Sequence, residues 1–194
     1  MINNFRQIIQ HIRFDSEDDF YHLQILKRKK ENPEIGSNSY VLRTYCIRSK
    51  EHLIEKQDEI TKLCIEHNAR AYINLNRRSF EKAAFHTLKK VTDIIMNKDY
   101  KSVRSAFESV CGEFGSGKDK FWIVDIDTKD ELVVHRVVHI IDTDLMPEGN
   151  KFQLCLPTKN GYHLITTPFN MAEFKERCPN IDVHKNNPTI LFCN

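Results

Sequence analysis

The spacing of apolar residues changes along the chain between the 3.6-residue period of a helix and the two-residue period of a strand. In the first half, alternating apolar residues on both sides of a turn at residues 32–36 predict a hairpin over residues 20–48. A short strand is expected at residues 71–75, and helices at residues 2–13, 50–68, 80–96 and about 99–111. Ser49 and Ser79 stand where helix N-caps are expected.

The second half contains the most apolar run of the chain, FWIVDID at residues 121–127, which predicts a buried strand. Residues 130–142 suit a helix, although their valine content leaves a strand open. An Asn-Gly pair at positions 160 and 161 predicts a second hairpin, and Asn170 can cap a short helix that follows it. The remaining strands are expected at residues 151–157, 162–167 and 181–193.

The order of these elements is mixed, so the sequence predicts an α+β or mixed α/β fold rather than a regular βαβ array. A length of 194 residues predicts a single domain, and 40% hydrophobic residues are enough to close a core. Six glycines and six prolines indicate few loose linkers.

Charge and cysteine content narrow the class of protein further. The net charge of +2 excludes a histone-like cover of positive charge but leaves room for a local basic groove. No stretch approaches the roughly 18 apolar residues of a membrane-spanning helix, and the N-terminus does not look like a signal peptide. Six widely spaced cysteines without a CxxC pair favour reduced thiols, so we expect a cytoplasmic protein with no membrane partner.

Asp125 and Asp127 end the apolar strand and are the first candidate for chemistry. Residues i and i+2 of a strand share a face, so the two carboxylates project side by side while Ile126 points into the core. Neighbouring carboxylates repel each other unless a cation lies between them, and Mg²⁺ prefers such oxygen ligands. A solvated strand end is the alternative interpretation.

Three other segments carry candidate ligands for a metal-bound phosphate. In the second hairpin, Thr158 and Lys159 lie on the turn and His163 follows inside an apolar strand, where it is either a phosphate ligand or a core histidine. Asp182 offers a third carboxylate, although a solvated acid is equally consistent with its spacing. Arg77 and Arg78 precede a helix and either clamp phosphate there or serve as surface charges.

One segment imitates a nucleotide-binding loop. Residues 112–119 nearly match GxxxxGK[ST], but Asp119 replaces the Ser or Thr that binds Mg²⁺. The predicted order is also helix, loop, strand rather than strand, loop, helix. We therefore expect a flexible connection into the strand at residues 121–127.

These motifs, taken in order, resemble the archaeo-eukaryotic primase superfamily, the primase-polymerases. That family has three motifs in a fixed order. The first is a strand of the pattern hhhDhD/E, where h is a hydrophobic residue, and the second is a strand that contains a small residue, then any residue, then His. The third is an acidic residue that directly follows a hydrophobic one later in the chain. This chain has IVDID at residues 123–127, NGYH at residues 160–163 and Ile181-Asp182. The segment YINLNRR at residues 72–78 also looks like the VNxR segment that precedes the catalytic half. Asn160 departs from the Ser or Thr that is usual before the glycine.

The resemblance implies a two-lobed primase-polymerase-like core, with an N-terminal lobe at about residues 1–110 and a catalytic half with an RRM-like sheet at 111–194. It implies that Asp125, Asp127 and Asp182 bind two Mg²⁺ or Mn²⁺ ions, with Asp142 or Asp144 as competitors for the third position. His163 and Lys159, with Thr158 nearby, would hold the triphosphate of the incoming nucleotide.

The function implied is metal-dependent synthesis of RNA or DNA on a template by a nucleotidyltransferase active in DNA replication or repair. Its partners would be template DNA, primer and nucleoside triphosphates, with a helicase or accessory primase subunit possible in trans. The basic run at residues 27–30, with Arg77 and Arg78, would contact the backbone, and Tyr40, Tyr45 or Phe80 would stack on bases. An inactive nucleic-acid-binding protein of this fold and a metal-dependent nuclease are the alternatives.

Overall fold

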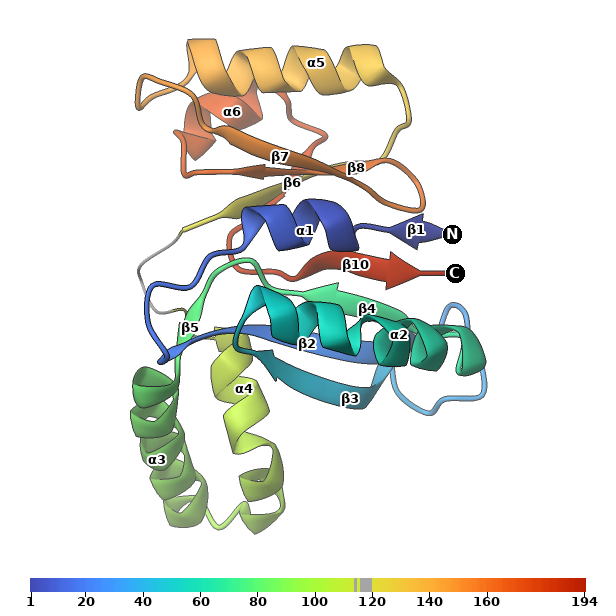
Figure 1. Cartoon of the computed structure of the whole chain (residues 1–194). Helices are drawn as coiled ribbons and strands as arrows, with labels where there is room; N and C mark the ends of the chain where they lie inside the picture. Colours follow the sequence, from blue (N-terminus) through green and yellow to red (C-terminus); the bar gives the residue numbers. More distant parts are fainter. Residues whose placement is uncertain (114, 116–119) are drawn as a thin grey trace.

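The computed structural model describes residues 1–113, 115 and 120–194, which form two antiparallel sheets with helices packed on them (Figure 1). The first sheet has the order β1-β10-β4-β2-β3 with β5 beside β2, and the second has the order β7-β8-β6-β9. The strands are β1 (Ile2–Asn3), β2 (Asp19–Arg28), β3 (Ser39–Ile47), β4 (Arg70–Ile73), β5 (Arg78–Ser79), β6 (Trp122–Ile126), β7 (Phe152–Pro157), β8 (Tyr162–Thr166), β9 (Asp182–His184) and β10 (Thr189–Cys193). The predicted α+β class is confirmed.

The helices follow the predicted order. They are α1 (Phe5–His11), α2 (Lys50–Glu66), α3 (Phe80–Met96), a 3₁₀ turn η1 (Tyr100–Ser105), α4 (Ala106–Glu113), α5 (Glu131–His139), a π turn η2 (Ile140–Asp144) and α6 (Met171–Arg177). Both predicted serine caps are present, since Ser49 accepts from the backbone N–H of His52 and Ser79 from that of Lys82. The helix at residues 130–142 is confirmed over its first part, and its last turn widens into η2.

Two predicted elements differ from the structure. The chain starts with strand β1 rather than helix, because Ile2 and Asn3 pair with Cys193 and Phe192 of β10. The single strand expected at residues 181–193 is split into β9 and β10, which belong to different sheets. Pro188, which has no backbone N–H to donate, lies in the connection. Of the loop expected at residues 112–120, Gly112 and Glu113 belong to α4, and 114 and 116–119 lie outside the described residues.

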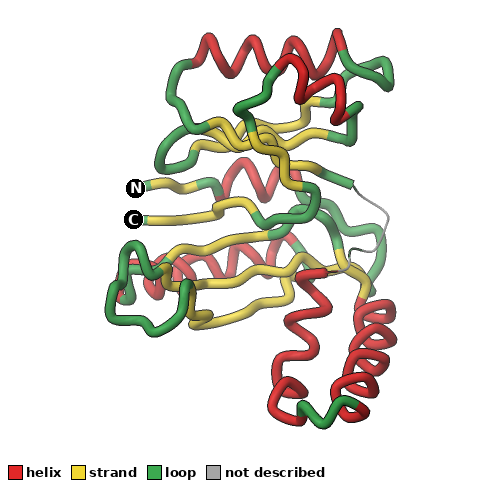
Figure 2. The backbone as a smooth tube through the Cα atoms, turned by 180° about the vertical axis from the view of Figure 1, so that it is seen from behind, coloured by secondary structure: helices red, strands yellow, loops and turns green. Residues whose placement is uncertain are grey.

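The first sheet buries one face and leaves part of the other open. Leu23 and Ile25 of β2 point into the core that α1 and α2 cover, since alternate residues of a strand share a face. Leu26 and Arg28 therefore lie on the opposite face, and both border a cleft. Seen from behind, no helix of the described chain lies over the central strands of this face (Figure 2).

Along the chain, the second sheet and its helices follow the order β6-α5-β7-β8-α6-β9. Within the sheet, β6 and β8 lie in the centre and β7 and β9 at the edges. This is the split βαβ topology. Val124 and Ile126 of β6 pack with Val137 of α5 and Phe174 of α6, so the two helices cover its outer face. Ile123 has the opposite orientation and faces the first sheet, as do Asp125 and Asp127 at the same spacing.

One core joins the two sheets. Ile123 and Ile165 of the second sheet pack in the same cluster as Leu23 and Phe192 of the first, and α1 lies between the sheets (Figure 1). The Nδ2 atom of Asn4, a buried residue, donates to Pro157 O at 3.1 Å and Ile190 O at 2.9 Å. Because β10 returns to the first sheet after β9 has joined the second, no single position near residue 110 separates two lobes.

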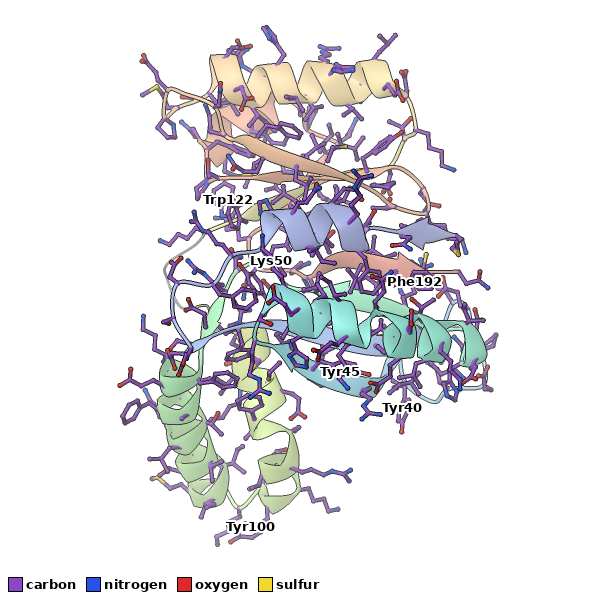
Figure 3. The ribbon with its side chains drawn as sticks, in the orientation of Figure 1. Tyr40, Tyr45, Lys50, Tyr100, Trp122 and Phe192 are labelled. Atoms are coloured by element: carbon purple, nitrogen blue, oxygen red, sulfur yellow. The ribbon has the colours of Figure 1, made fainter. Side chains whose placement is uncertain are left out.

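Helices α3 and α4 form a hairpin that projects from the first sheet, with Tyr100 at its tip (Figure 3). The base of this hairpin is held by Phe20 of β2, which stacks on Phe80 with ring centroids 4.2 Å apart. Phe80, one of the predicted base-stacking residues, is therefore an anchor of the hairpin. Among the described helices, none is long and apolar enough to cross a membrane.

Candidate active site

A single row across the second sheet brings together the central predicted residues. Asp125 of β6 lies directly opposite His163 of β8 on one side and Asp182 of β9 on the other. Residues directly opposite in antiparallel strands share a face, so all three start from the face that looks toward the first sheet. The apolar pattern of FWIVDID is consistent with this position, because a strand at the sheet centre buries most of its side chains.

His163 joins Asp125 to the first sheet. Its Nε2 lies 3.5 Å from Asp125 Oδ1, and its Nδ1 lies 2.8 Å from the hydroxyl of Thr189, the first residue of β10. Burial lowers the pKa of His163, and the negative charge of Asp125 only partly opposes this effect. The lowered pKa favours the neutral imidazole at pH 7. The carboxylate of Asp125 can only accept, so we assign the proton to Nε2, and Nδ1 then accepts from the hydroxyl of Thr189.

The row opens into a cleft of about 520 Å³ between the two sheets. The wall formed by the second sheet contains Asp125, Asp127, His163 and His184. The wall formed by the first sheet contributes two cations and a phenol, Arg28, Arg70 and Tyr72. The turn between β7 and β8 forms part of the rim with Thr158, Lys159 and Asn160. Most of the predicted site residues thus border one cleft.

Asp182 occupies a different position from the other two carboxylates. It borders a smaller hollow of about 210 Å³ that Asp125 and Asp127 also line. Its side chain is 78% exposed, and its Oδ1 lies 3.5 Å from the ammonium group of Lys175. Across the described residues, no three His, Cys, Asp or Glu side chains converge as a formed metal site. Asp125 and Asp127 are thus the carboxylate pair that faces the large cleft.

The turn at the rim depends on a glycine. The backbone N–H of Gly161 donates to Thr158 Oγ1 at 3.1 Å, and its carbonyl accepts from the N–H of Thr158 at 2.8 Å. A Cβ atom at Gly161 would lie 1.9 Å from the carbonyl oxygen of Ile126. Only glycine lets the turn that carries Lys159 approach the end of β6 this closely.

Arg77 and Arg78, the predicted phosphate clamp, do not line the cleft. Both side chains are 1% exposed. Arg77 Nη1 pairs with Asp19 Oδ2 at 3.1 Å, and Arg78 Nε donates to Cys111 O at 2.8 Å. Burial lowers the pKa of Arg78 to about 10. These contacts give both arginines a structural role, because a cation so enclosed has no face left for phosphate.

The asparagines of the same segment tie the two sheets together. The side chain of Asn76 accepts from the backbone N–H of Phe121 at 2.6 Å and donates to its carbonyl at 3.0 Å, which anchors the start of β6. Asn74 Nδ2 donates to Asn186 O at 2.7 Å, between β9 and β10. The YINLNRR segment therefore positions the strand that carries Asp125.

The two acids that were predicted as alternative metal ligands, Asp142 and Asp144, lie away from the cleft. Asp142 Oδ1 accepts from the backbone N–H groups of Lys151 and Phe152, and Asp144 pairs with Arg177 at 2.6 Å. Both acids lie in η2, on the side of the second sheet that α5 and α6 cover. They are thus occupied in local contacts rather than as metal ligands.

Of the predicted base-stacking tyrosines, Tyr40 is 57% exposed at the outer edge of β3 (Figure 3). Tyr45 is buried, and its hydroxyl donates to Glu59 at 2.8 Å. Of the three aromatic residues predicted to stack on bases, Tyr40 is therefore the one whose ring is accessible.

Sequence reasoning missed the contribution of the first sheet. Arg70 and Tyr72 are residues i and i+2 of β4, on the face opposite Ala71 and Ile73, which belong to the core. This alternation was visible in the sequence. The role of Thr189 was not, because β10 reaches His163 only through the tertiary fold.

The chain matches no model of a known protein family, no curated protein and no solved structure. The function must therefore be inferred from the cleft itself.

Proposed function

We propose that this protein is a metal-dependent nucleotidyltransferase of the primase-polymerase type, which adds nucleotides to a nucleic-acid strand on a template. The observation that carries the proposal is the pairing of Asp125 with His163 on adjacent strands, with Asp127 beside them in the same cleft. A carboxylate pair next to a neutral imidazole and several cations matches the needs of a metal-bound triphosphate.

The donor set suits Mg²⁺ or Mn²⁺. Asp125 and Asp127 provide hard oxygen ligands that share one face, and Mg²⁺ usually keeps further positions for water and substrate phosphate. Asp182 borders the adjoining hollow and would have to leave Lys175 to join them. When bound, the ions would neutralise charge on the phosphates during an in-line displacement.

The residues of the chain would orient the two substrates. The Nε2–H group of His163 and the ammonium of Lys159 would donate to the triphosphate. The primer 3′-hydroxyl would form a bond to the α-phosphorus and lose its proton to solvent, while the bond to the departing pyrophosphate breaks. With charge and geometry already set, most of the rate gain would come from positioning and electrostatics.

The first sheet would receive the nucleic acid. Arg28 lies in the cleft wall at the end of β2, and the basic run at residues 27–30 continues past it. Contacts of such cations with phosphates release counterions, so binding should weaken steeply with salt. A helicase or accessory primase subunit would act in trans, and the protein would work in the cytoplasm.

The test is extension of a labelled primer on a template, with and without Mg²⁺ or Mn²⁺. We expect wild-type protein to lengthen the primer only with metal, and Asp125→Asn or Asp127→Asn to abolish extension while circular dichroism stays unchanged. Asp58→Asn, on the exposed side of α2, is the matched control. Shortening of the strand would identify a nuclease, and binding without either reaction would identify an accessory protein.

A further inference from the structure

Two cations from different sheets converge on one carboxylate at the edge of the cleft. Glu31, in the loop after β2, forms an ion pair with Arg70 of β4 in which Arg70 Nε donates to Oε2 at 3.0 Å and Nη2 contacts Oε1. Lys159, on the β7–β8 turn, lies 3.9 Å from the same Oε1 atom. Arg70 and Lys159 both line the cleft that holds Asp127.

Arg70 and Lys159 are arranged as in an anion-binding site, and the carboxylate of Glu31 takes the place of the bound anion. A guanidinium binds carboxylate and phosphate through the same two-pronged donor geometry, and a lysine adds a mobile positive charge. The side chains of Arg70 and Glu31 are only 13% and 19% exposed, so water screens this pair less than a surface pair. The oxygens of Glu31 therefore occupy positions that phosphate oxygens would otherwise take.

The loop that carries Glu31 is fixed independently of the ion pair. The side chain of Asn68 donates to Glu31 O at 2.9 Å, and that of Asn32 donates to Asn68 O at 3.0 Å. The Glu31 side chain can thus leave Arg70 and return without a change in the backbone. Because its carboxylate has no covalent tie to the cations, an incoming polyanion competes with it directly.

We propose that Arg70 and Lys159 form a subsite for the terminal phosphates of a polyphosphate chain, and that Glu31 is its built-in counter-anion, displaced when the ligand binds. The inference rests on the proposed function in one respect, since that function identifies the polyphosphate as the tail of a nucleoside triphosphate. Glu31 then sets the affinity, because every binding event must break its contacts with both cations.

The test measures binding of inorganic tripolyphosphate by calorimetry in metal-free buffer, so that neither base nor metal contributes. Removing the competing charge in Glu31→Gln should tighten binding about two- to fivefold, the effect expected when one ion pair no longer has to be broken. Arg70→Gln and Lys159→Met should each weaken it. Glu34→Gln is the matched control, since Glu34 lies on the same loop but pairs with Lys27 outside the cleft. It should leave the dissociation constant unchanged.

A measurement on the wild-type protein avoids any effect of substitution on folding. Tripolyphosphate should shift the carboxylate ¹³C resonance of Glu31 and leave that of Glu34 in place. Equal or weaker binding by folded Glu31→Gln, or a Glu31 resonance that does not move, overturns the proposal. These readouts need no nucleotide incorporation. Failure of the proposed function in the extension assay can therefore be distinguished from failure of the proposed counter-anion role of Glu31.

Discussion

Thr189 and His163 form a hydrogen bond of 2.8 Å that crosses from the first sheet to the second at the cleft. Thr189 is fully buried, and its register opposite Ile73 of β4 holds the hydroxyl in place. A neutral imidazole that accepts at Nδ1 must carry its proton on Nε2, which faces Asp125. The hydroxyl of Thr189, from the first sheet, thereby supports the tautomer in which Nε2 of His163 donates into the cleft.

Replacing Thr189 by Val, which keeps the shape and removes the hydroxyl, should release His163 from this tautomer. We expect the apparent KM for nucleotide to rise about two- to tenfold with a smaller change in kcat, the effect expected from the loss of one ordinary hydrogen bond. The ¹⁵N shifts of the His163 ring should show a mixture of tautomers, whereas Thr189→Ser should retain a single form. An unchanged ring spectrum in Thr189→Val would contradict the positioning role.

Gly161→Ala should destabilise the protein by about 2–3 kcal/mol, because the added Cβ would meet the carbonyl of Ile126 at 1.9 Å and force the turn away from β6. The measurement is urea unfolding. Gly36→Ala is the control, since a Cβ there has no heavy atom within 4 Å. Similar free energies of unfolding for the two variants would show that the turn can move away at little cost.

Arg77→Met should cost about 3–5 kcal/mol, because it removes the guanidinium that neutralises the buried carboxylate of Asp19. Lys159→Met, by contrast, should change stability little, since its side chain is 61% exposed, but should raise the KM for nucleotide. Urea unfolding and initial rates at varied nucleotide concentration separate the two effects. A raised KM with unchanged stability in Arg77→Met would restore its predicted role as a phosphate ligand.

His22 should make stability depend on pH. Burial, with a smaller contribution from the positive charge of Arg78, lowers the pKa of His22 from 6.5 to about 4, and its Nε2 has no hydrogen-bond partner among the described residues. Between these values the unfolded chain binds a proton that the folded chain does not. Stability is therefore complete above pH 6.5 and falls as the pH drops toward 4, by about 3 kcal/mol.

Urea unfolding of wild type and His22→Gln between pH 4 and 7 checks this dependence. The variant carries no titratable group at the position, so its free energy of unfolding should fall less over the same range. Parallel curves would mean that the buried imidazole does not cause the loss.

Local patterns were enough to predict most elements. Ser49 and Ser79 cap their helices as expected, and the Asn-Gly turn joins β7 to β8. These features depend on neighbours within about four residues, which the sequence displays directly. The same holds for the placement of Asp125 and Asp127 on one face of a strand. Prediction failed at Ile2–Asn3, whose strand exists only because β10, from the other end of the chain, lies beside it.

By itself, the sequence determined most of the helices and strands and which polar side chains project from an apolar strand, because backbone periodicity and capping are local. The tertiary structure alone decided that Arg77 is enclosed while Arg70 faces the cleft, and that Glu31 meets Lys159 across it. Burial and ion pairing depend on segments that are far apart in the sequence and are brought together by a shared core. Such contacts between distant segments produce no periodic pattern that the sequence alone could show.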